Sequence, residues 1–323
     1  MLFHYRTNNP DLCDGITKSV GQHGYLLFAH QILASIPPQA EVFPVTTQIG
    51  VTKILNILIV SPHRDDAAFS LSISISHWLS AGHHVAILNV FTRSLYAPYS
   101  DADTVHQNDR LSYVSAMRKR EDEAMIKQFP RATITDLNIK DAPIRLHCDS
   151  SIVCDMDVDP KDSAFPKIRK AIVSALNGPR AINALVLPLG LGHHVDHRVA
   201  RDAALPLTTN LPCAFYEELP YATRKGVSID LSRFREDTST RFHEELHPVL
   251  CHGTHTRPAE YKKRLALLYA SQIDLAMADT IADFCHRYHG AERLWANDHW
   301  MSVSATEKLS TDRKSTRLNS SHW

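Results

Sequence analysis

The sequence has 323 residues, of which 44 % are hydrophobic and 22 % charged, a composition typical of globular proteins. Its 35 basic and 35 acidic residues give a formal net charge of zero, which argues against nucleic acid as a partner bound through bulk positive charge. No apolar run approaches the roughly 20 residues that a membrane span needs. A chain of this length can bury one sizeable core.

The six cysteines are scattered along the chain and form no Cys-x-x-Cys pair. Thiolate metal sites and thioredoxin chemistry therefore receive no support. We interpret the cysteines as reduced thiols, with two buried disulfides as the alternative. Together with an N-terminal stretch that does not resemble a signal peptide, this favours a cytoplasmic protein. The sequence pattern indicates no particular oligomeric state.

The first predicted elements form a strand-helix-strand unit. Residues 1–50 are expected to be an N-terminal extension with a helix near 20–35. Residues 54–60 form a nearly continuous apolar run, which predicts a strand buried on both faces of a parallel sheet. A helix is expected over 67–81 and a second strand over 85–91. Two strands joined by a helix within about 40 residues are typical of a βαβ unit.

The alternation of helices and strands continues along the chain. Residues 93–110 are predicted to be a loop, followed by helices over 111–128 and 164–177. A buried strand is expected over 184–188, a helix over 197–205 and a further strand over 213–216. This alternation predicts an α/β fold with a mainly parallel sheet. The polar stretch 305–323 is expected to be a disordered tail, so the main domain should span 51–304.

Two polar loops directly follow predicted strands. The first is Pro62-His63-Arg64-Asp65-Asp66, and the second is Gly192-His193-His194-Val195-Asp196-His197. In open α/β sheets, ligands bind at the carboxyl ends of the parallel strands. Imidazole and carboxylate groups without thiolate suit a catalytic divalent metal, zinc first, with one position left for water. We therefore predict a metal site built from these two loops.

The neighbouring carboxylates of Asp65 and Asp66 can divide the work, because consecutive side chains on an extended turn point in different directions. One can bind the metal while the other acts as general base on a water whose pKa zinc lowers to about 7. Purely structural interpretations also exist. The Asp65-Asp66 pair and Asp196 could be helix N-caps, His63 could be a satisfied histidine, and His193 is expected to be a bystander.

On these motifs the chain resembles the LmbE/PIG-L family of zinc-dependent N-deacetylases. Residues 57–70 and 187–200 are similar to its two signature loops, usually His-Pro-Asp-Asp-Glu and His-Pro-Asp-His, and weaker similarity extends over roughly 53–300. The resemblance implies a Rossmann-like three-layer sandwich with a mainly parallel sheet. The zinc ligands that it implies are His63, Asp66 and His197.

The resemblance also implies roles for other side chains. Asp65 would be the general base, His194 would polarise the substrate carbonyl or protonate the leaving amine, and Asp196 would orient a histidine. The side chains expected to bind substrate are Arg64, Arg118, Glu121, Asp141 and Tyr216.

The chain departs from the usual family motifs at three positions. Arg64 stands in place of a proline, Ala67 in place of a glutamate and Val195 in place of the second proline. None of the three is an expected metal ligand. Because the glutamate is missing, the usual contacts behind the metal ligands and the usual substrate of the family cannot be assumed for this chain.

The resulting expectation is a zinc-dependent hydrolase that removes an N-acetyl group from an amino sugar or glycoconjugate. Its partner would be a small N-acetylated sugar or glycoside, with specificity carried by residues 93–110, 141–165 and 216–224. One alternative is a zinc-dependent esterase or amidase that acts on a non-sugar substrate. Another is an inactive sugar-binding module, although such a module needs no base beside the metal.

Overall fold

The structure is a computed structural model that describes residues 54–224, 226, 231–236 and 245–307. The predicted extension 1–50, with its helix near 20–35, lies outside the described residues. The last described helix, α10 (Asp298–Glu307), continues beyond residue 304. The predicted tail therefore overlaps the end of this helix, and residues 308–323 lie outside the described part.

A seven-stranded sheet forms the centre of the domain, in the order β3-β2-β1-β4-β5-β7-β6. The strands are β1 (Asn56–Ser61), β2 (His84–Asn89), β3 (Ala132–Asp136), β4 (Ala184–Pro188), β5 (Cys213–Tyr216), β6 (His247–His252) and β7 (Ala291–Ala296). The first five are parallel, whereas β7 pairs antiparallel with both β5 and β6.

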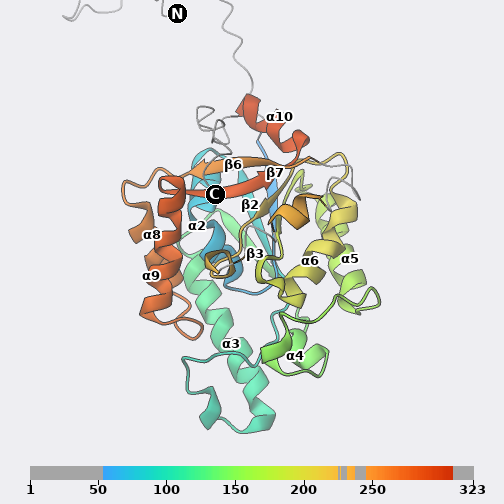
Figure 1. Cartoon of the computed structure of the whole chain (residues 1–323), viewed down its shortest axis with the longest axis vertical. Coiled ribbons are helices and arrows are strands. Elements are labelled where there is room, and N and C mark those ends of the chain that lie inside the picture. Colours follow the sequence, from blue (N-terminus) through green and yellow to red (C-terminus); the bar gives the residue numbers. More distant parts are fainter. Residues whose placement is uncertain (1–53, 225, 227–230, 237–244, 308–323) are drawn as a thin grey trace, which may run out of the picture. The chain divides into compact units, whose positions relative to one another are not determined.

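Helices cover both faces of this sheet (Figure 1). On one face α2 (Asp66–Ser80) packs against α8 (Pro258–Ala266), which in turn packs against α9 (Leu275–Asp283). On the other face lie α5 (Ala164–Leu176) and α6 (Val195–Ala204). The long helix α3 (Gln107–Ile126) connects β2 to β3, and the short helix α4 (Ala142–Arg145) follows β3. The predicted three-layer α/β architecture is confirmed.

The central strands form where the sequence has apolar runs. In β1 the five residues Ile57–Ser61 are all buried, as are all five residues of β4, which is the pattern of strands covered on both faces. All four predicted strands are present. The predicted helices 67–81, 111–128, 164–177 and 197–205 correspond to α2, α3, α5 and α6, although α3 begins four residues earlier than expected.

Three strands and four of the helices named above were not predicted. They are β3, β6, β7, α4, α8, α9 and α10. The strands β3 and β6 lie at the two edges of the sheet, where less exposed positions alternate with more exposed ones. The edge position also accommodates Pro248 in β6, because an edge strand has unpaired N–H positions. In β7 the buried residue Glu292 interrupts the apolar pattern.

Short 3-10 segments connect several of these elements. They are η2 (Ala102–Thr104), η3 (Ser150–Ile152), η4 (Leu191–His193), η5 (Leu205–Leu207), η6 (Tyr221–Thr223) and η7 (Phe284–Tyr288). No helix among the described residues is long and apolar enough to cross a membrane. The five cysteines of the described part are free thiols, and Cys13 lies outside it.

Candidate metal centre and active site

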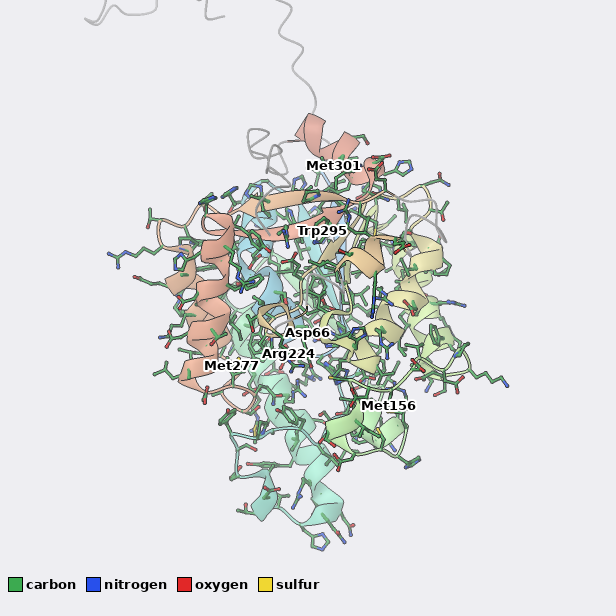
Figure 2. All side chains as sticks on the ribbon, viewed as in Figure 1. Asp66, Met156, Arg224, Met277, Trp295 and Met301 are labelled. Carbon is green, nitrogen blue, oxygen red and sulfur yellow. The ribbon has the colours of Figure 1, made fainter. Side chains whose placement is uncertain are left out.

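The two predicted loops meet at the point where the strand order of the sheet reverses. The strands β1 and β4 are neighbours, but the chain proceeds outward from them in opposite directions, to β2 and β3 on one side and to β5 on the other. Such a reversal opens a crevice at the carboxyl ends of the two strands. His63 follows β1 and His197 follows β4, so both histidines face this crevice. Asp66, labelled in Figure 2, lies near the middle of the view.

Glycines allow the second loop to fold tightly after β4. Gly190 and Gly192 have φ angles of +83° and +70°, a region that side-chain-bearing residues rarely adopt. At Gly192 an added Cβ atom would lie 2.4 Å from the Tyr221 ring. The loop therefore requires glycine for both its backbone conformation and its packing, and this conformation brings His194 and His197 to the start of α6.

The nitrogen and oxygen atoms of His63, Asp66 and His197 form a nearly equilateral triangle. His63 Nδ1 lies 3.4 Å from Asp66 Oδ2, His197 Nε2 lies 3.4 Å from the same oxygen, and the two nitrogens are 3.3 Å apart. A tetrahedral zinc with bonds of about 2.0–2.1 Å would hold its ligand atoms about 3.3–3.4 Å apart. The three side chains therefore have the spacing and the chemistry of a zinc ligand set.

A second possible ligand group, His63, His194 and Asp196, overlaps the first. Asp196 is less available as a ligand because other donors use both of its oxygens. Its Oδ2 accepts a hydrogen bond from Ala142 N–H at 2.9 Å, and its Oδ1 accepts one from Arg145 at 2.8 Å. The geometry thus favours the triangle that includes Asp66.

A buried carboxylate lies behind each histidine of the triangle. Asp196 Oδ2 is 3.1 Å from His63 Nε2, and Glu218 Oε1 is 3.3 Å from His197 Nδ1. Such contacts fix the ring orientation and direct the other nitrogen toward a metal. The sequence motifs predicted this role for Asp196 but not for Glu218. The signal was available, because Glu218 lies in the polar segment directly after β5.

Glu218 is itself held by the glycine loop. Its Oε1 accepts a hydrogen bond from Gly190 N–H at 2.5 Å, and its Oε2 accepts one from Leu191 N–H at 3.3 Å. The carboxylate is fully buried. It therefore links the end of β5 to the loop after β4 and fixes His197 between them.

The buried carboxylates in and behind the triangle favour a positive charge at this place. Burial disfavours the charged form of His63, but hydrogen bonds to Asp196 and Asp66 outweigh it and raise the His63 pKa to about 10. Burial likewise opposes ionisation of Asp66, yet the positive field of His197 and the contacts with His63 lower its pKa to about 2. A proton on His63 thus compensates the buried carboxylates, and a divalent metal could replace it.

Asp65 and Asp66 point to different surroundings, as predicted. Asp65 Oδ1 accepts a hydrogen bond from Arg118 at 3.1 Å, whereas Asp66 Oδ2 accepts one from the backbone N–H of His63 at 2.8 Å. Asp65 occupies the N-cap position of α2, but its side chain caps no backbone N–H. The N-cap interpretation of this side chain is therefore not supported. Asp65 stands one residue from a candidate ligand with its carboxylate held by a buried arginine.

His194 lies against both candidate histidine ligands. The ring centroids of His194 and His63 are 5.0 Å apart, and those of His194 and His197 are 5.1 Å apart. Its Nδ1 accepts a hydrogen bond from Asp196 N–H at 3.2 Å, which leaves the hydrogen of a neutral ring on Nε2. Burial, with the nearby His63 and His197, lowers the His194 pKa to about 3. His194 is therefore a neutral hydrogen-bond donor.

Arg64 is engaged inside the protein. Its guanidinium donates to Asp122 at 2.6 Å and to both oxygens of Asp136, at 3.0 and 2.7 Å. Asp122 also accepts hydrogen bonds from Asn89 and Tyr269. These contacts tie the first loop to α3 and to the end of β3, and the expected substrate contact of Arg64 stays a prediction.

The other expected substrate residues divide into two groups. Glu121 accepts hydrogen bonds from the backbone N–H and hydroxyl of Ser271, and the buried Tyr216 donates its hydroxyl hydrogen to the carbonyl of Val60. Both side chains are therefore engaged in hydrogen bonds within the protein, and their expected substrate contacts stay predictions. Arg118 and Asp141, by contrast, lie beside the site.

Asp141 is nearly fully buried, and its Oδ1 has no hydrogen-bond partner within the described residues. Burial raises its pKa, opposed by a hydrogen bond with Ser94 and by the charge of His63. A buried oxygen without a partner near His63 is a candidate acceptor for a substrate N–H or hydroxyl group.

The ring of Tyr221, a residue for which the sequence predicted no individual role, lies against the site. Its ring centroid is 5.2 Å from that of His197 and 6.3 Å from that of His194. The predicted specificity segment 216–224 contains this residue. The packing of the Tyr221 ring against Gly192 could not be predicted from the sequence, because the two residues are far apart along the chain.

The chain is similar to known proteins in sequence and in structure. Residues 58–208 match the PIG-L family, described as GlcNAc-PI de-N-acetylase. The chain is 25 % identical over 186 residues to the 2'-N-acetylparomamine deacetylase of Niallia circulans, covering 51 % of this chain and 66 % of that protein. It is 27 % identical over 183 residues to the enzyme of the same name from Streptomyces fradiae, covering 54 % and 61 %. The matches thus span just under two thirds of each relative's length.

Solved structures show the same fold at lower sequence identity. The zinc-inhibited form of teicoplanin deacetylase Orf2 is 20 % identical with a TM-score of 0.56, and the similarity covers 75 % of this chain and 97 % of that one. A deacetylase-teicoplanin complex is 21 % identical with a TM-score of 0.53, covering 75 % and 98 %. At this identity the similarity establishes the fold.

Proposed function

Because residues 58–208 carry a PIG-L family domain, we propose that the protein is a zinc-dependent hydrolase of an N-acetyl group on an amino sugar or glycoconjugate. The observation that carries the proposal is the triangle of His63, Asp66 and His197, with atom separations of 3.3–3.4 Å. The carboxylate of Asp65 stands next to it in the chain. The names of the two curated relatives support the class of substrate.

The metal would be held by His63 Nδ1, Asp66 Oδ2 and His197 Nε2. A zinc ion bound there supplies Lewis-acid chemistry, because it lowers the pKa of a water to about 7 and polarises a carbonyl. Asp196 and Glu218 each accept the remaining ring hydrogen of one histidine, which holds the metal-facing nitrogen unprotonated.

Asp65 is the proposed general base. Arg118 engages its Oδ1, and no hydrogen bond from the described residues reaches its Oδ2. That oxygen is the proposed acceptor of a proton from the attacking water. The contact with Arg118 fixes the carboxylate in one orientation, so that little rearrangement is needed before proton transfer.

His194 is the proposed donor to the developing oxyanion. Because its Nδ1 is used by Asp196 N–H, its Nε2–H is the group that can donate to the amide oxygen. The low pKa of His194 favours this hydrogen-bonding role over proton donation to the leaving amine. Asp65, once protonated, is then the proposed source of the proton for the amine.

Arg118, Asp141 and Tyr221 are the proposed contacts to the sugar. The buried Asp141 Oδ1 and the buried Arg118 Nε have no hydrogen-bond partner within the described residues. Together they offer one acceptor and one donor to substrate polar groups. Tyr221 adds an aromatic face beside the two histidines. The free thiols support the further proposal of a cytoplasmic location.

The proposal is tested by measuring acetate release from a panel of N-acetylated amino sugars, including 2'-N-acetylparomamine, N-acetylglucosamine glycosides and an N-acetylated glycopeptide. Zinc-loaded protein should release acetate from at least one member, and a chelator should abolish the activity. His194→Ala should lower turnover with zinc retained, whereas His193→Ala, at the exposed neighbouring position, should not. Zinc-dependent cleavage of simple acyl esters without any acetate release from the panel would instead support the esterase alternative.

A further inference from the structure

A polar cavity separate from the candidate metal ligands lies where α3 passes the carboxyl ends of β2 and β3. Its volume is about 280 Å³, enough for a small molecule or for one group of a larger one. None of the candidate metal ligands lines it, and neither does Asp65. Its lining includes Arg64, Thr92, Arg93, Ser115, Lys119 and Asp136.

Four of these residues have a buried polar atom without a hydrogen-bond partner in the described part of the chain. The atoms are Arg64 Nε, Thr92 Oγ1, Arg93 Nε and Ser115 Oγ. All four groups can donate a hydrogen, and the two arginine nitrogens can only donate. Buried donors are nearly always paired in proteins, so four unpaired donors around one cavity indicate that an acceptor belongs there.

The charges around the cavity indicate the kind of acceptor. Arg64 uses its terminal nitrogens on Asp122 and Asp136, and both oxygens of Asp136 are occupied by that contact. Asp136 is the single carboxylate among the lining residues. Arg93 and Lys119 form no ion pair with any described residue. Water could satisfy the hydroxyl groups, whereas an anion would also pair with these two cations.

We propose that this cavity binds a phosphate-class oxyanion. Phosphate carries several acceptor oxygens on a compact group, so it can accept hydrogen bonds from the segments after β1 and β2 and from α3 at once. The group could be free phosphate or the phosphate of a sugar phosphate. The inference stands on the cavity alone and does not depend on the proposed deacetylation.

The position of the cavity would connect its occupant to the catalytic loops. Arg64 precedes Asp65, and Lys119 follows Arg118, which contacts Asp65. Arg93 precedes Ser94, whose hydroxyl interacts with Asp141. An oxyanion in the cavity would therefore be held by residues adjacent in sequence to the proposed base and its partner.

The test is a titration of inorganic phosphate into the full-length protein, prepared with and without zinc, followed by calorimetry. Saturable binding of one phosphate is expected in both forms. Arg93→Gln and Lys119→Gln should each raise the dissociation constant about tenfold or more, as expected for loss of one charge-assisted contact. Ala116→Leu should weaken binding by filling the cavity without removing a charge.

The matched control is Arg120→Gln, which removes a charge from the exposed surface of the same helix outside the cavity. It should leave phosphate binding unchanged. Lys119 is also exposed, so its variant should fold even if Arg93→Gln does not. Absence of saturable binding, or equal binding by wild type and the Arg93 and Lys119 variants, would overturn the proposal.

A parallel titration with N-acetylglucosamine 6-phosphate distinguishes the two sources of the group. Tighter binding of the sugar phosphate than of inorganic phosphate, lost in Arg93→Gln, would assign the cavity to a phosphorylated sugar. Equal affinity for both would assign it to free phosphate. Acetate release from neutral sugars is measured separately, so failure of the phosphate site and failure of the deacetylase proposal give different results.

Discussion

The two histidines of the metal triangle differ in the partners that orient them. Asp196 behind His63 is also bound by Arg145 and by Ala142 N–H, whereas Glu218 behind His197 is bound only by backbone groups among the described residues. The carboxylate behind His63 therefore has a cationic partner that the carboxylate behind His197 lacks. The sequence motif contains Asp196 but not Glu218. The carboxylate behind His197 is therefore brought to the site by the fold and not by the motif.

Glu218→Gln should weaken metal binding about 10–100-fold, because contacts of this kind orient the ligand and raise its basicity. The amide keeps the size of the side chain and loses its charge. Competition with a chromophoric zinc chelator measures the change. Glu217→Gln is not a suitable control, since Glu217 accepts hydrogen bonds from Arg293 and Trp295. The exposed Glu260→Gln should leave zinc affinity unchanged, and an equal effect of both variants would contradict the role of Glu218.

Zinc binding should release about one proton per site near pH 8. The His63 pKa is raised to about 10, so the metal-free site holds a proton on this histidine throughout the neutral range. The stability due to that charged pair is present below the unfolded pKa near 6.5 and is lost as the pH rises through about 10. Zinc affinity should therefore increase with pH up to about 10. Calorimetry in buffers of different ionisation enthalpy counts the protons, and a count of zero would contradict the assignment.

At the scale of elements, contacts of helix α2 with β7 and α8 hold the first loop of the site in place. Glu292 of β7 accepts hydrogen bonds from Ile73 N–H, Ser74 N–H and the Ser74 hydroxyl of α2, and it forms a buried ion pair with Lys262 of α8. The helix α2, which begins at the candidate metal ligand Asp66, is thereby fixed to the antiparallel end of the sheet.

Lys262→Met should lower the free energy of unfolding by about 3–5 kcal/mol, because it leaves the Glu292 carboxylate buried without its cation. Lys263→Met provides the matched control at the next position, where the lysine pairs with the half-exposed Asp279, and should cost less than about 1 kcal/mol. Urea unfolding measures both. Similar losses in the two variants would show that the buried pair does not stabilise the α2 connection.

The elements that could be predicted from the sequence are those whose hydrophobic pattern depends only on how deeply they are buried. The apolar runs of β1 and β4 and the loops after them could be read directly, because a strand covered on both faces is apolar throughout. In β7, Glu292 and Arg293 are matched by Lys262 and Glu217, which are distant in sequence. Local periodicity contains no information about such partners, and for the same reason it could not show that Arg64 pairs with Asp122 and Asp136.

At the scale of the whole molecule, the proposed metal would join segments separated by more than 130 residues. His63 follows β1, and His197 lies in α6. A ligand that binds the folded state alone stabilises it by about 2.7 kcal/mol at a concentration 100 times its dissociation constant. Removal of zinc by a chelator should therefore lower the melting temperature by roughly 5–10 °C, at about 2–4 °C per kcal/mol for a domain of this size.

The control for the melting experiment is His197→Ala, which lacks one metal-facing nitrogen. Its melting temperature should respond little to zinc or to the chelator. His193→Ala should respond as the wild type does. A melting temperature of the wild-type protein that is independent of zinc would contradict a metal bridging the two loops.

The most direct test of the central claim is acetate release by wild type and Asp65→Asn at equal, measured zinc occupancy. Both proteins should carry about one zinc per chain, since Asp65 lies outside the ligand triangle. The variant should lose about 10²–10⁴-fold in turnover, the usual cost of removing a general base, while Asp103→Asn, at a highly exposed carboxylate, should retain full activity. Near wild-type turnover of zinc-loaded Asp65→Asn would contradict the account.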